Sequence, residues 1–343
     1  MTLANSVWNV SEQSFPGTAP IETQLRFLLR YAVLAPSVRN TQPWAFAIEG
    51  NSVLLYADWA RGQPVADADD RELYLSLGCA LENLLVAAEH YGFGHDTEYL
   101  PLPAGHPLTA RIEFHPGGTP TPARAGLGPG TLVSRHNDYG VFRAVPVPEP
   151  VRQELEGCRL EGEPRLDLTE DWLFRRWLDA LTAEADHLDY ADPRFRRELA
   201  AWIGRGVFRT PFPRLGALAV SRLDLGDSVA RQDHKLVDST GLFGVLSAAG
   251  DDHLTHLRAG QLFERIWLRA TAAGVSLHPM SQTMRHRELR AAVAELLPEP
   301  GSTPVHLFRL GYGYHEAESH HRTPRWPAEE VVLRRPDPPD DPD

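Results

Sequence analysis

The chain has 343 residues, of which 42% are hydrophobic and 23% charged, a composition typical of a globular protein with one large domain or two ordinary ones. Its formal net charge of -12 argues against nucleic-acid binding, which requires a basic surface. Because it contains no run of about 18 apolar residues and no basic, apolar leader, we expect a cytoplasmic protein without a membrane partner.

The first predicted elements are a helix and a hairpin. Apolar residues recur with helical spacing over 21–34, and Pro36 closes this helix because the residue before a proline is disfavoured in helical geometry. The stretch WAFAIEGNSVLLYA, residues 44–57, combines two β-rich runs with a Gly-Asn pair between them. This pattern predicts two antiparallel strands joined by a tight turn.

A second helix is predicted from about residue 69 to 91, with Asp69 or Asp70 as its cap and Gly92 at its end. The Gly/Pro-rich segment 116–130 has no periodicity and is expected to join two halves. Beyond it, the patterns predict helices at 168–190, 193–203, 253–273 and 285–297, and strands at 242–248 and 304–313.

An internal repeat appears when residues 69–92 are aligned with 251–274, an offset of 182. Gly78 then coincides with Gly260, and Glu82 with Glu264. Any two buried helices with an acidic cap and a closing glycine look partly alike, but a glycine inside a helix costs about 1 kcal/mol relative to alanine. Two such glycines at one register predict close helix approach at equivalent places, as in a duplicated chain that forms a covalent pseudo-dimer.

The expected division of the chain follows from the repeat and from composition. It comprises an N-terminal extension (1–20), a first half (21–115), a linker (116–130), a second half (131–333) with a lid at about 190–216, and a disordered acidic tail (334–343).

Segment 35–42, APSVRNTQ, gathers hydrogen-bonding side chains where the first predicted helix gives way to the first predicted strand. Ser37 and Asn40 offer short donors and acceptors, Gln42 an amide and Arg39 a fixed cation. Loops of this composition usually satisfy their own side chains. From the residues alone, a self-contained polar turn and a ligand-contacting loop both remain open.

The sequence A-P-S-V-R-N-T-Q-P-W, residues 35–44, resembles the A-P-S-x-x-N-x-Q-P-W segment that contacts the flavin across a subunit interface in the FMN-dependent nitroreductase superfamily. Residues 71–93 are similar to that family's long central helix, and residues 258–282 to its partner helix and the loop over the flavin ring. FRLGYG and PRWPAEEVV resemble its closing strand and phosphate-binding segment. The double length and the N-T-Q-P-W spelling most resemble the mycobacterial dormancy-associated flavin-binding branch, in which one polypeptide imitates a dimer and holds one FMN.

The resemblance implies an α+β nitroreductase-like fold, with a mixed or antiparallel sheet flanked by helices and two pseudo-repeated halves that mimic the family homodimer. It also implies a set of residues that would contact FMN: Ser37, Arg39, Asn40, Gln42, Arg135, His136, Asn137, Pro279, Met280 and Arg325.

Within this implied set, Arg135 and Arg325 would hold the phosphate, with Arg143 as an alternative because the segment after Asn137 lacks the further basic residues of relatives. Arg39 would stabilise the negative charge that develops near N1 and O2 of the reduced ring, and Asn40 or Gln42 would contact its pyrimidine edge. No protein acid, base or nucleophile is required, because the flavin carries the chemistry.

The implied function is NAD(P)H-dependent, two-electron reduction of a small aromatic, nitro or quinone-like acceptor by a ping-pong flavin mechanism. NAD(P)H would visit transiently, since the chain has no GxGxxG fingerprint. The alternative is a non-catalytic FMN-sequestering protein in which the predicted lid covers the flavin. Either protein would be a monomeric pseudo-dimer or a weak homodimer.

A metal-dependent enzyme is the remaining alternative, because one C-terminal loop offers metal-ligand side chains at a spacing that fits no structural zinc pattern. These residues are His315, Glu316, Glu318, His320 and His321.

The other polar or sulfur-bearing candidates have plain structural explanations. Cys79 and Cys158 are too few for a disulfide framework or thiolate site and are expected in the core. His253 and His256 are expected on the exposed face of a helix start, and His278 at the surface or at a cap.

Overall fold

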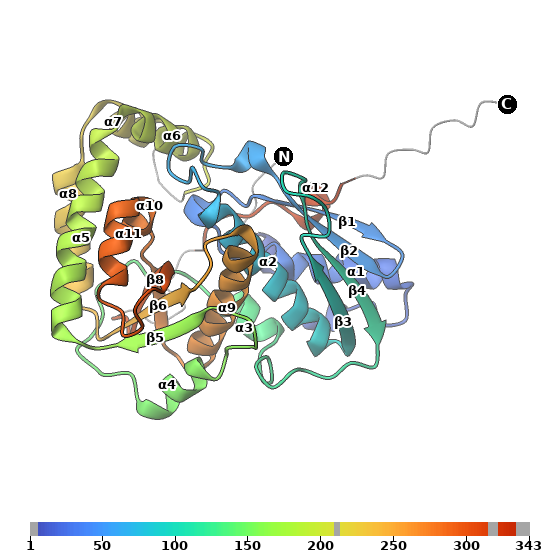
Figure 1. The fold of residues 1–343 in the computed structure, drawn as a ribbon. Helices are drawn as coiled ribbons and strands as arrows, with labels where there is room; N and C mark the ends of the chain where they lie inside the picture. The colour runs from blue at the N-terminus through green and yellow to red at the C-terminus, as the bar shows by residue number, and fades with distance from the viewer. Residues whose placement is uncertain (1–5, 209–212, 315–321, 334–343) are drawn as a thin grey trace.

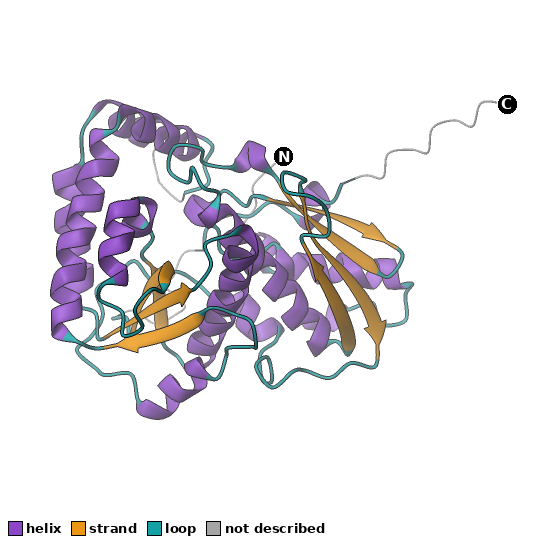
Figure 2. Cartoon of the chain, in the orientation of Figure 1, coloured by secondary structure: helices purple, strands orange, loops and turns teal. Residues whose placement is uncertain are grey.

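The computed structural model describes residues 6–208, 213–314 and 322–333 (Figure 1). Within these ranges the strands form two separate four-stranded sheets, and all neighbouring strands are antiparallel. Helices lie between the sheets and around the second one (Figure 2). The α+β class expected from the sequence is confirmed. The acidic tail at 334–343 and the histidine loop at 315–321 lie outside the described residues.

The first half builds one sheet and two helices that pack on it. The predicted hairpin is present, with Gly50 at φ 61° in its turn. The elements are α1 (Ile21–Ala32), β1 (Trp44–Glu49), β2 (Ser52–Ala57), α2 (Arg71–His90), β3 (Phe93–Tyr99) and β4 (Leu108–Pro116), and the strand order is β1-β2-β4-β3.

The second half repeats this order of elements. Its members are α4 (Glu149–Glu156), β5 (Arg165–Thr169), β6 (Leu242–Ala248), α9 (His253–Ala272), β7 (Ser276–Pro279) and β8 (Thr303–Gly311), and the strand order is β5-β6-β8-β7. Helix, hairpin, long helix and strand pair therefore occur twice in the same sequence. The two pseudo-repeated halves are confirmed, whereas the division of the chain into the segments given above remains a proposal.

The halves differ mainly by insertions in the second one. Where the first half has a tight turn between its hairpin strands, the described part of the second half has four helices, which form the outer wall on one side of the molecule (Figure 1). They are α5 (Trp172–Ala191), α6 (Pro193–Gly204), α7 (Pro213–Arg222) and α8 (Gly226–Asp238).

Shorter elements connect these parts. They are α3 (Pro129–Ser134), α10 (Gln282–Arg285), α11 (Arg287–Ala294), α12 (Ala328–Val331) and the 3-10 turns η1 (Ser6–Trp8), η2 (Glu12–Ser14), η3 (Val38–Asn40) and η4 (Trp59–Arg61).

The two central helices, α2 and α9, touch at the aligned glycines. A Cβ atom on Gly78 would lie 2.0 Å from the backbone oxygen of Leu257, and one on Gly260 would lie 2.0 Å from the backbone oxygen of Leu75. Leu75 and Leu257 are themselves related by the offset of 182. The contact is thus nearly two-fold symmetric, and it confirms the close approach predicted from the repeat.

Buried ion pairs reinforce the same interface. Both carboxylate oxygens of Glu82 on α2 accept hydrogen bonds from Arg265 on α9 and from Arg124, at 2.6–2.9 Å. Arg265 also pairs with Glu163. Charges this deeply buried are tolerated only when they are paired and hydrogen-bonded, and removing one partner typically costs about 3–5 kcal/mol.

The C-terminal segment returns from the second sheet to the first half. Val332 forms a parallel bridge with Phe46, and the Leu333 amide donates to the Phe46 carbonyl at 2.7 Å. The preceding residues 322–326 therefore cross the seam between the halves. This crossing matters for the pocket described below.

Several predicted details are corrected by the structure. Asp70 adopts left-handed geometry and makes no cap hydrogen bond, and Asp69 accepts only a long hydrogen bond of 3.4 Å from the Arg71 amide. Asp67 is the main cap of α2, accepting from the amides of Glu72 and Leu73. The predicted helix at 285–297 is divided at His286, whose extended φ/ψ separates α10 from α11. Strand β7 lies in the segment that was expected to be a loop. The other elements that were not predicted are strands β3, β4 and β5 and helices α3, α4, α7, α8, α10 and α12.

Cys79 and Cys158 are free and buried, as expected. Across the described ranges, no helix combines the length and apolar character needed to cross a bilayer.

Substituting Gly78→Ala should lower the free energy of unfolding by roughly 2–3 kcal/mol, because the new methyl group overlaps backbone atoms of α9 that cannot rotate away. Gly130→Ala in α3 is the matched control, since its Cβ would meet nothing within 4 Å and should change stability by less than about 1 kcal/mol. Urea denaturation of both variants checks this, and equal stabilities would show that the helices are not in fixed close contact.

Candidate functional site

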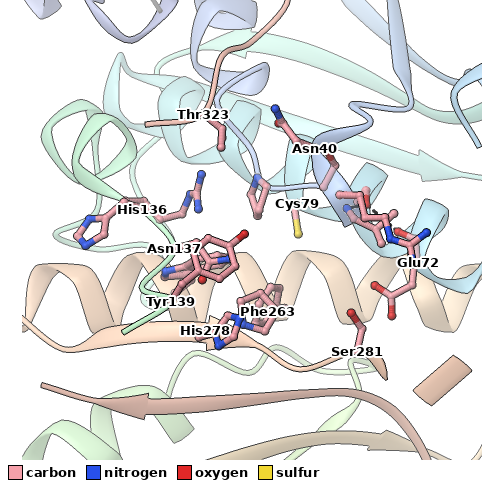
Figure 3. Close-up of a pocket in the computed structure, with 18 of the residues that line it drawn as sticks. Asn40, Glu72, Cys79, His136, Asn137, Tyr139, Phe263, His278, Ser281 and Thr323 are labelled. Atoms are coloured by element: carbon pink, nitrogen blue, oxygen red, sulfur yellow. Dashed lines mark hydrogen bonds between the residues drawn. The ribbon is translucent and has the colours of Figure 1, made fainter. Parts of the chain in front are cut away.

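A cavity of about 450 Å³ lies at the seam between the halves, within the usual size range of small-molecule sites. Both central helices contribute to its wall, with Leu75 and Cys79 from α2 and Phe263 and Trp267 from α9. In Figure 3, His136 and Asn137 lie toward one end of the cavity, and Glu72 and Ser281 lie toward the other. Of the sequence-predicted site residues, the lining includes Ser37, Arg39, Asn40, Arg135, His136, Asn137, Pro279 and Arg325, but not Gln42 or Met280.

The loop at 35–42 borders the cavity in an unusual backbone conformation. Arg39, Asn40 and Gln42 have φ values of 48°, 58° and 52°, in the left-handed region that non-glycine residues rarely adopt. The Ser37 hydroxyl accepts a hydrogen bond from the Gln42 amide at 2.9 Å and so closes the turn. Strain of this kind persists only where the surroundings fix it, and it is frequent at functional sites.

The side chains of Asn40 and Gln42 hold the loop in this conformation. The Asn40 amide donates to the carbonyls of Val207 and Pro324, and its oxygen accepts from Arg325 at 2.7 Å. Gln42 is fully buried, donates to the Asn40 carbonyl, and accepts from the Trp326 amide at 2.9 Å. Their side chains therefore bind the loop to the returning C-terminal segment. In the structure neither presents an unused amide to the cavity.

Arg39 reaches toward the inserted helices. Its Nη1 donates to Gln63 at 2.8 Å and lies 3.7 Å from a carboxylate oxygen of Glu198 on α6, while its guanidinium lies 4.4 Å from the ring centre of Phe195. Burial, together with the charge of Arg285, lowers the pKa of Arg39 to about 10. Arg39 is thus a cation at neutral pH, shared between the cavity and α6.

The arginine end of the cavity, defined by Arg135, Arg322 and Arg325, concentrates positive charge. Arg135 and Arg325 are 2% and 3% exposed, and the buried partner nearest to their charge is Glu264, whose Oε1 lies 3.2 Å from Arg135 Nε. Both Arg135 and Arg325 donate to the Leu34 carbonyl. Arg325 also donates to Thr323 and Asn40, yet its Nε has no hydrogen-bond partner among the described residues.

This cluster is electrostatically unbalanced. Burial and the neighbouring Arg135 charge lower the pKa of Arg325 to about 9. Burial raises the pKa of Glu264 to about 7 in spite of Arg135, so its carboxylate neutralises the arginines only partly near neutral pH. A dehydrated cluster of like charges is costly, and an anion placed between the guanidinium groups would relieve that cost.

Of the remaining predicted residues, some line the cavity and others lie outside it. Pro279 lines the cavity, whereas Met280 packs in the core beneath β8. Arg143 stacks on Tyr312 and is not part of the lining. His278 was expected at the surface or at a cap, but it faces the cavity and accepts from Arg309 at 3.0 Å; burial and that arginine lower its pKa to about 3.

Several polar cavity residues were missed from the sequence, among them Glu72, Ser281, Arg285 and His306. Glu72 lies in the first turn of α2, where carboxylates are common, so its position gave no signal for a site. His306 had a usable signal, because it is one of two ionisable residues, with Arg309, in an otherwise apolar strand pattern.

Of the other candidate clusters, the structure places the helix-start histidines and leaves the histidine loop untested. The described residues contain no group of side chains suited to a metal ion, and the histidine loop with His315 lies outside them. His256 is 2% exposed and bonded to Asp251, and His253 stacks on Tyr74, so the expected exposed polar face is wrong.

Comparisons with known proteins give one consistent result. No protein-family model matches the chain. A Mycobacterium tuberculosis protein with the provisional name NAD(P)H nitroreductase is 29% identical over 329 residues, which cover 91% of this chain and 92% of the relative. PigM of a Serratia species, which has the same kind of provisional name, is 27% identical over 322 residues, covering 84% and 88%. Among solved structures, the FMN-dependent nitroreductase NfnB of Mycobacterium smegmatis in complex with NADPH covers 59% of this chain and 95% of its own, at 16% identity and a TM-score of 0.41.

Glu264→Gln should flatten the pH dependence of stability. The folded protein retains the Glu264 proton up to a pKa of about 7, whereas the unfolded chain releases it near 4.5, so the wild-type free energy of unfolding falls as pH rises through this range. Titration of Glu264 makes the free energy of unfolding fall by up to about 1.4 kcal/mol per pH unit, and a glutamine at this position contributes no such slope. Urea denaturation across this pH range measures both slopes; equal slopes would contradict the assignment.

Proposed function

We propose that the chain belongs to the FMN-dependent nitroreductase superfamily, in the double-length branch of its mycobacterial relatives, and that it is an FMN-binding oxidoreductase; its similarity over most of its length to proteins with nitroreductase names supports this. The proposed reaction is the NAD(P)H-dependent reduction of a small aromatic, nitro or quinone-like acceptor. The observation that carries the proposal is the buried arginine cluster at one end of the seam cavity.

The arginine end suits a phosphate dianion. Arg135 and Arg325 are buried, the carboxylate of Glu264 near Arg135 is partly protonated, and the Arg325 Nε donor has no hydrogen-bond partner in the described part of the chain. Charge-assisted hydrogen bonds contribute roughly 1.5–3 kcal/mol each, and one guanidinium can make two. These residues would hold the FMN phosphate, and His136 and Asn137 lie beside them in the cavity wall.

The rest of the cavity suits a planar ring system. Its walls include Phe208, Phe263 and Pro279, whereas the rings of Trp8 and Trp267 lie against the guanidinium groups of Arg325 and Arg135. Burying one flavin-sized face, about 200 Å² of largely apolar surface, contributes roughly 5 kcal/mol at 25 cal/mol/Å².

Bound FMN would supply the two-electron chemistry, passing a hydride from NAD(P)H to the acceptor in ping-pong order. The protein would orient the reactants and exclude water through its aromatic walls. Arg39 stays cationic at the edge of the cavity, where it would favour developing negative charge. No described residue needs to act as a nucleophile in this scheme.

Removing one phosphate-binding arginine tests the cofactor. Arg325→Met should weaken FMN binding about 10- to 1000-fold, as expected for the loss of one or two charged hydrogen bonds. Binding of riboflavin, which lacks the phosphate, should change much less. Fluorescence titration of both ligands measures the ratio of their affinities.

Arg143→Met is the matched control for this experiment, because Arg143 lies over Tyr312 outside the cavity lining. It should leave the affinity for FMN unchanged. Failure of the wild-type protein to bind FMN in excess, or equal losses for FMN and riboflavin in Arg325→Met, would overturn the assignment.

A second candidate function, storage of FMN without turnover, is favoured by the position of α6. Both carboxylate oxygens of Glu198 accept backbone amides of the first half, from Val65 and Ala66 at 3.0 Å each, and Arg39 lies beside them. The segment after α6 brings Phe208 into the cavity wall and binds Asn40 through the Val207 carbonyl. These contacts cover the cavity from the side of the inserted helices.

Glu198→Ala should loosen this cover, because α6 loses its charged bonds to the first half. We expect bound FMN to dissociate about 10-fold faster and to be reduced faster by NADPH, as monitored by stopped-flow absorbance. Glu184→Ala on the exposed side of α5 is the control. Storage is supported if only the loosened variant is reduced, and reduction is supported if the wild type already turns over.

Other aspects of the proposed function follow from the fold. A site completed by both halves of one chain suits a monomeric pseudo-dimer, with at most weak further association. Use of NAD(P)H also suits the cytoplasmic location expected from the sequence.

A further inference from the structure

Two buried polar side chains at the carboxylate end of the cavity, Glu72 and His306, have no role in the site described so far. They come from different halves, Glu72 from the first turn of α2 and His306 from the middle of β8. Both line the cavity, with exposures of 3% and 1%. Figure 3 shows the Glu72 carboxylate at the end opposite His136.

Arg71 fixes the position of Glu72. Its Nη1 donates to Glu72 Oε1 at 2.7 Å and to the carbonyl of Val305 at 2.7 Å, so one guanidinium joins the carboxylate to the residue before His306. Glu72 Oε2 accepts no hydrogen bond from any described residue. The subsite therefore offers one oriented carboxylate oxygen as an acceptor.

His306 offers the complementary group. Neither of its ring nitrogens has a hydrogen-bond partner among the described residues. Its ring is held by Phe263 and Phe308, with centroids 4.3 and 6.3 Å away. Burial lowers its pKa to about 4, so at neutral pH it carries one N–H donor and one bare nitrogen. A buried imidazole with both nitrogens unsatisfied is costly unless a ligand completes it.

A Glu72 oxygen as the acceptor and the His306 N–H as the donor both belong to residues that line this cavity. Together they match one class of ligand group. An amide or imide presents an N–H beside a C=O, so its N–H can donate to Glu72 while its C=O accepts from His306. A carboxylate ligand fits poorly, because it would face the Glu72 charge without a donor of its own.

We propose that Glu72 and His306 form a subsite for an amide or imide group on a planar heterocycle. Given the proposed function, two sources carry this group: the pyrimidine ring of the flavin and the carboxamide of the nicotinamide. The subsite takes over the edge-contacting role first expected of Asn40 and Gln42, whose side chains are committed to the C-terminal segment.

The first arm of the test uses FMN and its N3-methyl derivative, which lacks the imide N–H. If the flavin occupies the subsite, wild-type protein should bind N3-methyl-FMN about 10- to 100-fold more weakly, and Glu72→Gln should reduce this difference. Fluorescence titration supplies the affinities and requires no turnover.

The second arm uses FMN-loaded protein with nicotinamide, N,N-dimethylnicotinamide and nicotinate, which share one ring. If the nicotinamide occupies the subsite, only the primary amide should bind well, about 10-fold or more above the others, and the N3-methyl effect should be absent. Difference absorbance of the flavin band reports binding. Insensitivity in both arms would overturn the proposal.

Variants complete the test. In Glu72→Gln, Arg71 holds the amide oxygen and turns the NH₂ group toward the cavity, which replaces the acceptor by a donor. His306→Phe removes the imidazole nitrogens among aromatic neighbours. Glu89→Gln, a buried carboxylate outside the cavity lining, is the control for loss of a buried charge. Thermal unfolding verifies that each variant folds.

Failure of the subsite and failure of the proposed function remain distinguishable. If wild-type protein binds no FMN, the proposed function fails, and the same comparison is made with lumiflavin, N3-methyl-lumiflavin and nicotinamide on the cofactor-free protein. If FMN binds but neither N3-methylation of FMN nor N,N-dimethylation of nicotinamide changes the affinity, only the proposed subsite is wrong.

Discussion

The close contact of α2 with α9 at Gly78 and Gly260 determines where everything else lies. Because no side chain separates the helices at this point, their backbones meet and each half positions its sheet on the outer side. The cavity forms along this seam, with wall residues such as Cys79 from one helix and Trp267 from the other. The site is therefore a property of the interface and belongs to neither half alone.

Buried charge is handled in two different ways along that interface. Each carboxylate oxygen of Glu82 accepts hydrogen bonds from both Arg124 and Arg265, and Oε2 also accepts from Gln261, so Glu82 needs no further partner. Glu264, its counterpart at the offset of 182, lies near Arg135 without a hydrogen bond to either oxygen. The satisfied cluster stabilises the fold, whereas the unsatisfied one lies where a ligand can enter. A buried charged group that stabilises the fold is therefore fully hydrogen-bonded, whereas a buried charged group that can bind a ligand keeps atoms without a partner.

Features with a local cause could be predicted from the sequence. The first helix, the hairpin and the glycine contact each depend on spacing within a short segment. Ser37, Arg39 and Asn40 of the loop at 35–42 line the cavity, and their role there remains a proposal. Strand β5 was missed because RLDLT is short and directly precedes a helix. Pro324 and Trp326, which bind the side chains of Asn40 and Gln42, lie 284 residues further along the chain, and only the tertiary path of the chain brings them together. His306 and Glu72 were missed for the same reason.

Fusion of two related halves into one chain removes a restriction that every homodimer obeys. In a homodimer, a substitution that benefits one copy of a site is imposed on the other copy as well. Here Glu82 is fully hydrogen-bonded, whereas Glu264 at the equivalent position accepts no hydrogen bond from the described residues. The strands of one hairpin are separated by four described helices, and those of the other by a two-residue turn. The two halves can therefore differ at equivalent positions. Glu82 belongs to an internal ion-pair cluster that stabilises the fold, whereas Glu264 lies next to Arg135 of the cavity wall and accepts no hydrogen bond from the described residues.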